Sequence, residues 1–175
     1  MDTEKKLKYL LTEKSIKSIF RYLIVLLLIG ICGSIYVFIK INEIQQNDIL
    51  LYTIIVSISV CLMFCSIKYI RKLYLACIES RIERPEDDMI HRSMGVAIYF
   101  YLRPAFAVVF VIIAIFAMLA GLLIVTSSLD YVLNNKFLYL SVIVSSFIGY
   151  SIGSVMDRFG DYSQKQVEKT FNQKQ

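Results

Sequence analysis

The sequence predicts an all-α, polytopic membrane protein with four transmembrane helices and a short cytoplasmic helical hairpin between the second and the third. The 175-residue chain is 57% hydrophobic and only 19% charged, which is less charge than a soluble surface of this size needs. Its mean hydropathy is +0.63. The apolar residues gather in four long runs, and the Lys and Arg residues lie almost entirely on one side of these runs.

The four apolar runs cover residues 19–41, 49–67, 104–125 and 137–156, to within a few positions. Each contains roughly 19 to 23 residues, enough for a helix to cross a hydrocarbon core of about 30 Å. No Asp, Glu, Lys or His stands in the middle of any run. Lipid offers no partners to backbone polar groups, so only helices are expected here. Residues 19–156 therefore form the predicted membrane domain.

The distribution of positive residues predicts the orientation of these spans. Of the nineteen Lys and Arg residues, only Lys40 and Lys136 lie in the loops after spans one and three. Of the other seventeen, sixteen lie in the two tails and in the segment 68–103, and Arg21 lies near the cytoplasmic end of span one. Cytoplasmic loops carry the excess of Lys and Arg. We therefore expect both termini and residues 68–103 in the cytoplasm, and the protein in a plasma (inner) membrane.

The two tails differ in character. Residues 1–18 place Leu7, Leu10, Leu11 and Ile16 at roughly helical spacing between lysines. This amphipathic tail is either an interfacial helix on anionic lipid or a plain charged tail. Residues 157–175 are rich in Gln and Lys and predict a solvated cytoplasmic tail.

The cytoplasmic hairpin is expected within residues 68–103. The second helix should continue past the membrane through Tyr69 towards Ile82, and Pro85 followed by acids is typical of a new helix start. Pro104 is expected in the first turn of span three, where its missing N–H costs little. About 35 residues are too few for an independent core, so the hairpin should rest on the tails, the membrane or another chain.

Span four carries the clearest local pattern. Ser141, Ser145, Gly149 and Gly153 recur every four residues and end in a GxxxG motif. Small residues allow close approach of helix backbones in lipid. Two interpretations remain open: packing inside the bundle, or a contact between copies of the chain that includes the lining of a small passive pore.

The sequence offers little chemistry for an enzyme. The four cysteines lack disulfide or zinc spacing, and we expect no metal and no cofactor. Transport coupled to ions usually needs an ionisable group at membrane depth, and the spans have none. A passive pore lined by hydroxyls needs no such charge.

His91 is the only histidine, and Arg84 precedes it by six intervening residues. This spacing resembles the R-x(4–6)-H motif of HEPN ribonucleases, which implies Arg84 and His91 as catalytic candidates acting on RNA phosphate across a dimer. The resemblance covers eight residues, and Pro85 replaces the polar residue that usually follows the Arg. The alternative is a solvated, salt-bridged turn.

The sequence therefore favours a non-enzymatic accessory or partner-binding membrane subunit that acts as an oligomer. A homo-oligomeric pore is the first alternative, and the membrane-tethered ribonuclease is the second. The expected partners are the lipid bilayer, further copies of the chain and an unidentified cytoplasmic protein. Acids are interleaved with the basic residues of the middle segment, so no nucleic-acid groove is expected. The candidate partner-binding residues are Arg81, Arg84, Asp87, Asp88, His91 and Arg92.

Overall fold

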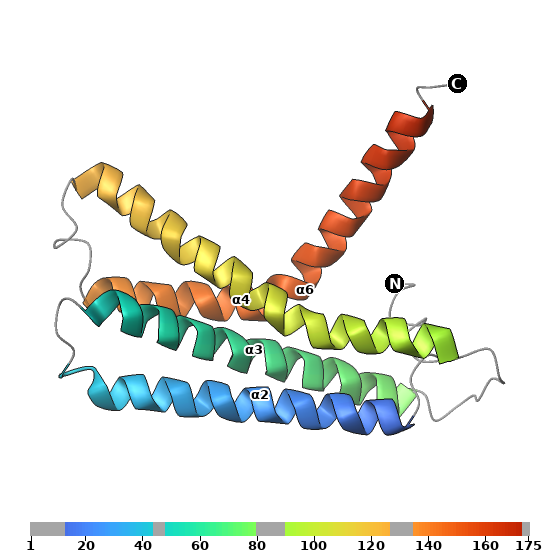
Figure 1. The fold of residues 1–175 in the computed structure, drawn as a ribbon, viewed down its shortest axis with the longest axis horizontal. Helices are drawn as coiled ribbons and strands as arrows, with labels where there is room; N and C mark the ends of the chain where they lie inside the picture. Colours follow the sequence, from blue (N-terminus) through green and yellow to red (C-terminus); the bar gives the residue numbers. More distant parts are fainter. Residues whose placement is uncertain (1–12, 44–47, 80–89, 127–134, 173–175) are drawn as a thin grey trace.

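A computed structural model describes residues 13–43, 48–79, 90–126 and 135–172, with side chains for 14–43, 48–75, 100–123, 136–155 and Arg158. These residues form four helices: α2 (Glu13–Lys40), α3 (Ile49–Glu79), α4 (Ile90–Thr126) and α6 (Asn135–Asn172) (Figure 1). Each contains a segment long and apolar enough to cross a membrane: Lys14–Lys40, Ile49–Leu75, Phe100–Leu123 and Lys136–Val155. The prediction of an all-α chain with four membrane helices is confirmed.

The helices extend beyond the predicted spans at one end of the bundle. The second span was expected to cover 49–67 and its helix to continue past the membrane through Tyr69, and α3 does continue, through Lys68, Arg71 and Lys72 to Glu79. Lys and Arg are good helix formers, so a charged residue ends an apolar run without ending the helix. The turn predicted near Pro85 lies outside the described residues.

Pro104 does not lie in a first helical turn, so that prediction was wrong. α4 begins at Ile90 and runs through Pro104 without a break. Proline removes one backbone hydrogen bond, and a membrane helix tolerates this loss where neighbouring groups bind the freed carbonyls. The helix changes direction partway along its length (Figure 1), as expected for an interior proline.

α3 is the central helix and packs against the other three. Half of its apolar span is buried, compared with 17% for α2 and for α4. α2 and α3 are antiparallel, because Gly30 approaches Met63 whereas Gly33, further along α2, approaches Ser59. α6 runs parallel to α3, because Gly149 lies against Cys61 and Gly153 against Tyr69.

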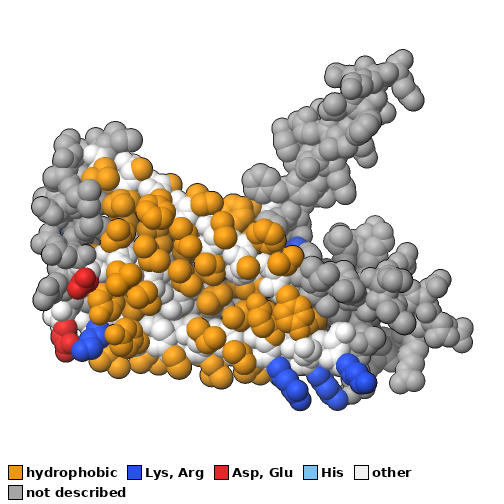
Figure 2. Space-filling model, viewed as in Figure 1, with side chains coloured by type: hydrophobic (Ala, Val, Ile, Leu, Met, Phe, Trp, Pro, Cys, Tyr) orange, Lys and Arg blue, Asp and Glu red, His pale blue; other side chains and the backbone are white. Residues whose placement is uncertain are grey.

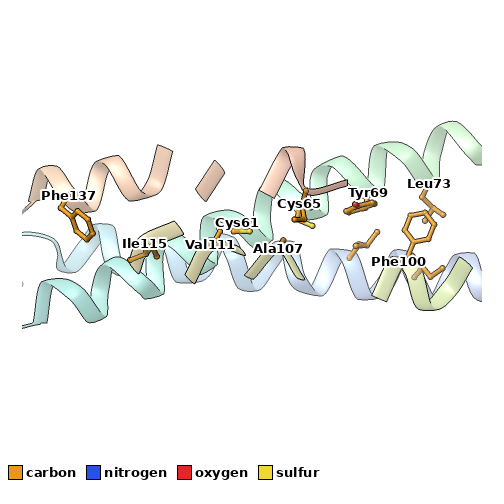
Figure 3. Close-up of a cluster of buried hydrophobic side chains, with 12 residues drawn as sticks. Cys61, Cys65, Tyr69, Leu73, Phe100, Ala107, Val111, Ile115 and Phe137 are labelled. Carbon is orange, nitrogen blue, oxygen red and sulfur yellow. The ribbon is translucent and has the colours of Figure 1, made fainter. Parts of the chain in front are cut away.

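The main core lies between α3 and α4 (Figure 3). Its members are almost fully buried and come from all four helices: Ile19, Leu23, Cys61, Cys65, Tyr69, Leu73, Phe100, Ala107, Val111, Ile115, Phe137 and Ile152. A smaller cluster of Val37, Val56, Val60 and Leu138 joins α2, α3 and α6. Phe137 lies near one end of the main core, and Tyr69 and Phe100 lie towards the other. The smaller side chains of Cys61 and Ala107 lie between these rings.

The outside of the bundle is apolar. Large apolar side chains such as Ile39 and Phe147 are 71% and 70% exposed. Figure 2 shows hydrophobic side chains covering the middle of the molecule, with charged side chains confined to its ends. A surface of this kind needs lipid around it, because exposed apolar patches of this extent are unusual in soluble monomers.

Candidate functional site

Positive charge is concentrated at one end of the bundle, where α2 and α4 begin and α3 ends. The described basic side chains of this end are Lys14, Lys17, Arg21, Lys68, Arg71, Lys72, Arg103 and Arg158. At the other end, the described charged side chains are two basic and two acidic ones: Lys40, Lys136, Glu43 and Asp48. Lys40 and Glu43 form an ion pair at 2.5 Å. We call the first of these the basic end (Figure 2).

Arg103 is the buried charge of the basic end. It lies on α4 with 4% of its surface exposed, and its guanidinium donates a 2.9 Å hydrogen bond to the Tyr69 hydroxyl on α3. The guanidinium carbon also lies 5.6 Å from the centroid of the Tyr69 ring. A buried cation is costly unless hydrogen bonds and neighbouring groups compensate for lost water, and the Tyr69 hydroxyl and ring both do so.

The Tyr69 ring is itself fixed by its neighbours. Tyr69 is completely buried, and Phe100 packs edge-on against it with ring centroids 5.8 Å apart at 82°. Edge-to-face pairs are a favoured aromatic geometry. Phe100 and Arg103 are one turn apart on α4. A single turn of α4 therefore provides both the ring and the guanidinium that contact Tyr69.

Gly153 on α6 completes the arrangement. A Cβ placed at Gly153 would lie 2.7 Å from an Arg103 terminal nitrogen, 2.8 Å from the Tyr69 hydroxyl and 3.5 Å from the Lys68 ammonium. The absence of a side chain at this position therefore leaves space for three polar groups. The Lys68 ammonium also lies 5.2 Å from the centre of the Tyr150 ring. We call Lys68, Tyr69 and Arg103 around Gly153 the basic cluster.

A second polar contact joins α2 to α4 beside Pro104. The Tyr22 hydroxyl donates to the Tyr101 carbonyl at 3.2 Å, and the two rings lie 4.8 Å apart between centroids with their planes tilted by 56°. Ser18 and Tyr101 share a further hydrogen bond of 2.8 Å between their hydroxyls. Pro104 removes the helical donor to the carbonyl of Phe100, four residues earlier, and the α2 hydroxyls bind the next residue, Tyr101. The segment from Phe100 to Pro104 thus contacts α2, α3 and α6.

The small residues of span four face the inside of the bundle. Ser141 and Ser145 are buried and donate to the carbonyls of Phe137 and Ser141 on their own helix, at 2.8 and 2.6 Å. A Cβ at Gly149 would lie 2.5 Å from the Cys61 carbonyl oxygen of α3. The outward face of α6 carries larger side chains instead, such as Phe147 and Tyr150.

The α3 side of this contact is also built from small residues. Thr53, Ser57, Cys61 and Cys65 recur every four residues and are buried. The hydroxyls of Thr53, Ser57 and, further along, Ser66 have no hydrogen-bond partner in the structure. Two parallel helices with small residues every four positions can approach closely along their whole contact, and we call this contact the α3–α6 seam.

None of the residues predicted to bind a partner has a described side chain. Arg81, Arg84, Asp87 and Asp88 lie outside the described residues. His91 and Arg92 fall in the first turn of α4, with side chains outside the described set. The geometry of the Arg84 and His91 pair therefore stays a prediction.

Sequence reasoning missed the basic cluster. Arg103 and Lys68 were counted only as markers of orientation, and Tyr69 only as part of a helix. One signal was present: an Arg directly before Pro104 and a Lys-Tyr pair at the end of span two occupy similar depths in neighbouring helices. That two cations meet at Gly153 depends on how the helices rotate, and a sequence pattern does not give this rotation.

No protein-family model, no curated protein and no solved structure matches the chain.

Proposed function

We propose that the chain is a non-enzymatic integral membrane protein of the plasma membrane, acting as an accessory or partner-binding subunit. Its basic end faces the cytoplasm and engages a cytoplasmic protein. The positive-inside rule supports this orientation, because the basic end gathers eight of the described Lys and Arg side chains.

One observation carries the proposal: three helices continue through charged sequence at the basic end. α3 runs on to Glu79, α4 begins ten residues before Phe100, and α6 continues past Asp157 to Asn172. The last part of α6 turns away from the other helices (Figure 1). At the opposite end, by contrast, α2 stops at Lys40 and α3 starts at Ile49, both at the limits of their spans.

When helices extend beyond the lipid at just one end of a bundle, they provide a surface on that side of the membrane to which a protein partner can bind. The seventeen residues of α6 after its span ends at Val155, at a rise of about 1.5 Å each, reach roughly 26 Å past the span. An isolated polar helix of this length is marginal in water. Contact with a partner would supply the packing that such a helix lacks.

Self-association belongs to the same proposal. The small residues of α6 are covered by α3, so contacts between copies would use the outward apolar faces of α2 and α4. Phe38 on α2 and Ile113 on α4 exemplify these faces, at 58% and 57% exposure. A symmetric pore lined by Ser141 and Ser145 would require these residues to leave the α3–α6 seam.

The test is site-specific photocrosslinking in cells. A photoreactive residue replaces Tyr74, which is 63% exposed near the basic end of α3, and the matched control replaces Glu43 at the opposite end. We expect a discrete protein adduct from position 74 and not from position 43, and its loss when Arg71 and Lys72 are changed to Glu. Equal labelling from both positions, or none from position 74, would contradict the proposal.

Two further assays separate the alternatives. Proteoliposomes containing the purified chain should remain tight to ions, whereas steady ion flux would favour the pore. The variants Arg84→Ala and His91→Ala should keep the cellular phenotype of the wild type. If either variant abolishes the phenotype at normal expression, the ribonuclease hypothesis takes precedence.

A further inference from the structure

We infer that the half of the α3–α6 seam away from the basic end binds water molecules inside the membrane. The site consists of four buried hydroxyl groups, two on α3 and two on α6: Thr53, Ser57, Ser141 and Ser145. The inference requires that the bundle lies in a membrane, and it does not depend on a cytoplasmic partner.

The hydroxyls of the two helices occupy matching levels along the seam. A Cβ at Gly149 would lie 2.5 Å from the Cys61 carbonyl oxygen, which fixes the register of the two parallel helices at that level. Successive steps of four residues towards the start of each helix keep this register. The resulting level pairs are Ser145 with Ser57 and Ser141 with Thr53.

The opposite side of α3 belongs to α2. There Ser59 and Met63 lie against the glycines of α2, and Ser59 is about 200° around the helix from Ser57. Thr53 and Ser57 instead share the helix face of Cys61, four and eight residues earlier. Both side chains therefore lie on the seam side of α3.

The two hydroxyls of α3 need a hydrogen-bond partner. Thr53 and Ser57 are completely buried, and neither hydroxyl bonds to any group that the structure describes. Ser141 and Ser145 give their hydroxyl hydrogens to carbonyls of α6, so their oxygens keep lone pairs that can accept. A buried polar group without a partner is costly, above all in lipid. A small molecule that bonds to both sides of the seam would remove this cost.

Water suits this set of groups better than an ion does. No Asp or Glu occurs in the four spans, so a cation bound among the hydroxyls would lack a compensating charge. Water is neutral, donates as well as accepts, and needs about two to four polar partners when buried. Where facing hydroxyls do not bond directly, a bridging water makes a bond to each.

Water also has a short route to this level. Thr53 is four residues inside the span that begins at Ile49, and Ser141 is five residues inside the span that begins at Lys136. At a rise of about 1.5 Å per residue, the first hydroxyl pair lies roughly 6 to 8 Å from the ends of these spans. The membrane surface away from the basic end is therefore the expected source of the water.

The test is hydroxyl-radical labelling by X-ray radiolysis of the full chain in detergent, in water enriched in a heavy oxygen isotope. Radiolysis converts a bound water into a radical that labels the side chains beside it. Cys61 is the reporter, and Cys65 is its matched control, because both are completely buried on successive turns of α3 (Figure 3). Cys65 is one turn further from Ser57. We expect heavy-oxygen label at Cys61 in clear excess over Cys65.

A double variant removes the two orphan hydroxyls and nearly keeps the shape of the seam. In Thr53→Val, Ser57→Ala, the label at Cys61 should fall to the level of Cys65. Ser59→Ala is the matched control, because it removes a hydroxyl on the α2 side of the same helix that already donates to the Ile55 carbonyl. This control should leave the label at Cys61 unchanged.

Two outcomes would overturn the inference. Equal labelling of Cys61 and Cys65 in the wild type would mean that Thr53 and Ser57 turn to carbonyls of their own helix, and this comparison needs no variant to fold. Label at Cys61 that persists in the double variant would indicate radicals from bulk solvent. A failed photocrosslinking test would contradict the partner proposal and leave this inference intact, because the seam takes no part in that contact.

Discussion

The Arg103 guanidinium on α4 donates a 2.9 Å hydrogen bond to the Tyr69 hydroxyl on α3, inside a bundle whose outer surface is apolar. This bond joins α3 to α4, the next described helix in the chain. Gly153 of α6 lies against both groups. Three of the four helices are therefore fixed to one another at the basic end by polar contacts.

Tyr69→Phe should destabilise the bundle, because it removes the acceptor for Arg103 and keeps the ring. Hydrogen bonds to charged groups contribute about 1.5 to 3 kcal/mol, although side-chain hydrogen bonds in membrane proteins average nearer 0.6 kcal/mol. We expect a loss of about 1 to 2 kcal/mol in the free energy of unfolding in detergent. Tyr74→Phe, on the exposed side of the same helix, should change it by less than about 0.5 kcal/mol. Equal effects of the two variants would mean that the bond to Arg103 contributes nothing.

Tyr22→Phe should destabilise the contact between α2 and α4. It deletes the donor to the Tyr101 carbonyl beside Pro104, leaving that carbonyl with one partner fewer. The expected cost is about 1 kcal/mol, read from the midpoint of thermal unfolding. Tyr139→Phe, at a side chain of α6 that is 48% exposed, serves as the control. An unchanged midpoint for Tyr22→Phe would show that the carbonyls near Pro104 need no donor from α2.

Gly149→Ala and Gly121→Ala should have opposite signs. A methyl group at Gly149 meets the Cys61 backbone oxygen at 2.5 Å, so the helices must separate at a cost of about 1 to 3 kcal/mol. At Gly121 the methyl group meets no atom within 4 Å, and alanine favours a helix over glycine by up to about 1 kcal/mol. If Gly149→Ala does not destabilise the protein, the close contact of α3 and α6 is contradicted. If Gly121→Ala destabilises it as much as Gly149→Ala does, the loss at Gly149 is not specific to that contact.

The double variant Gly149→Leu, Gly153→Leu should unfold or loosen the single chain. Both glycines lie in the α3–α6 seam, and leucine cannot fit against a backbone oxygen or among the basic cluster. We expect lower yield and a lower unfolding midpoint, and no defined smaller assembly by native mass. A stable variant that passes cleanly from oligomer to monomer would instead place these glycines between copies of the chain.

The four spans could be predicted from sequence because their physical cause is local. Twenty apolar residues without a central charge have one stable form in lipid, and this holds for each span separately. The continuation of α3 could be predicted for a similar reason. Lys68, Arg71 and Lys72 mark the end of the apolar run but favour helix as strongly as leucine does, so the helix was expected to continue beyond its span, and it does.

Pro104 shows a limit of such prediction. Proline is common at the first position of a helix, so Pro104 was expected in the first turn of span three. Nothing in the sequence reveals that a tyrosine from another helix lies beside the same turn. Tyr22 and Ser18 lie about eighty positions away from Tyr101.

Part of the candidate site could be predicted from the sequence and part could not. The spacing of Ser141, Ser145, Gly149 and Gly153 identified a close-packing face, but the same spacing suits a neighbour in the chain or in another copy. The matching series from Thr53 to Cys65 on α3 distinguishes the two only once the helices are known to be parallel. The basic cluster depends on three helices at once and had no signature in any one of them.

The most direct test of the account is the side of the membrane on which each end of the bundle lies. Single cysteines are introduced at Lys17, Glu43, Lys136 and Arg158 after Cys32, Cys61, Cys65 and Cys77 have been replaced by Ser. A membrane-impermeant maleimide is then applied to intact cells and to permeabilised cells. The account predicts that positions 43 and 136 are labelled in intact cells, whereas positions 17 and 158 are labelled only after permeabilisation. Labelling of position 17 or 158 from outside, or of all four positions alike, would contradict a four-span bundle with its basic end in the cytoplasm.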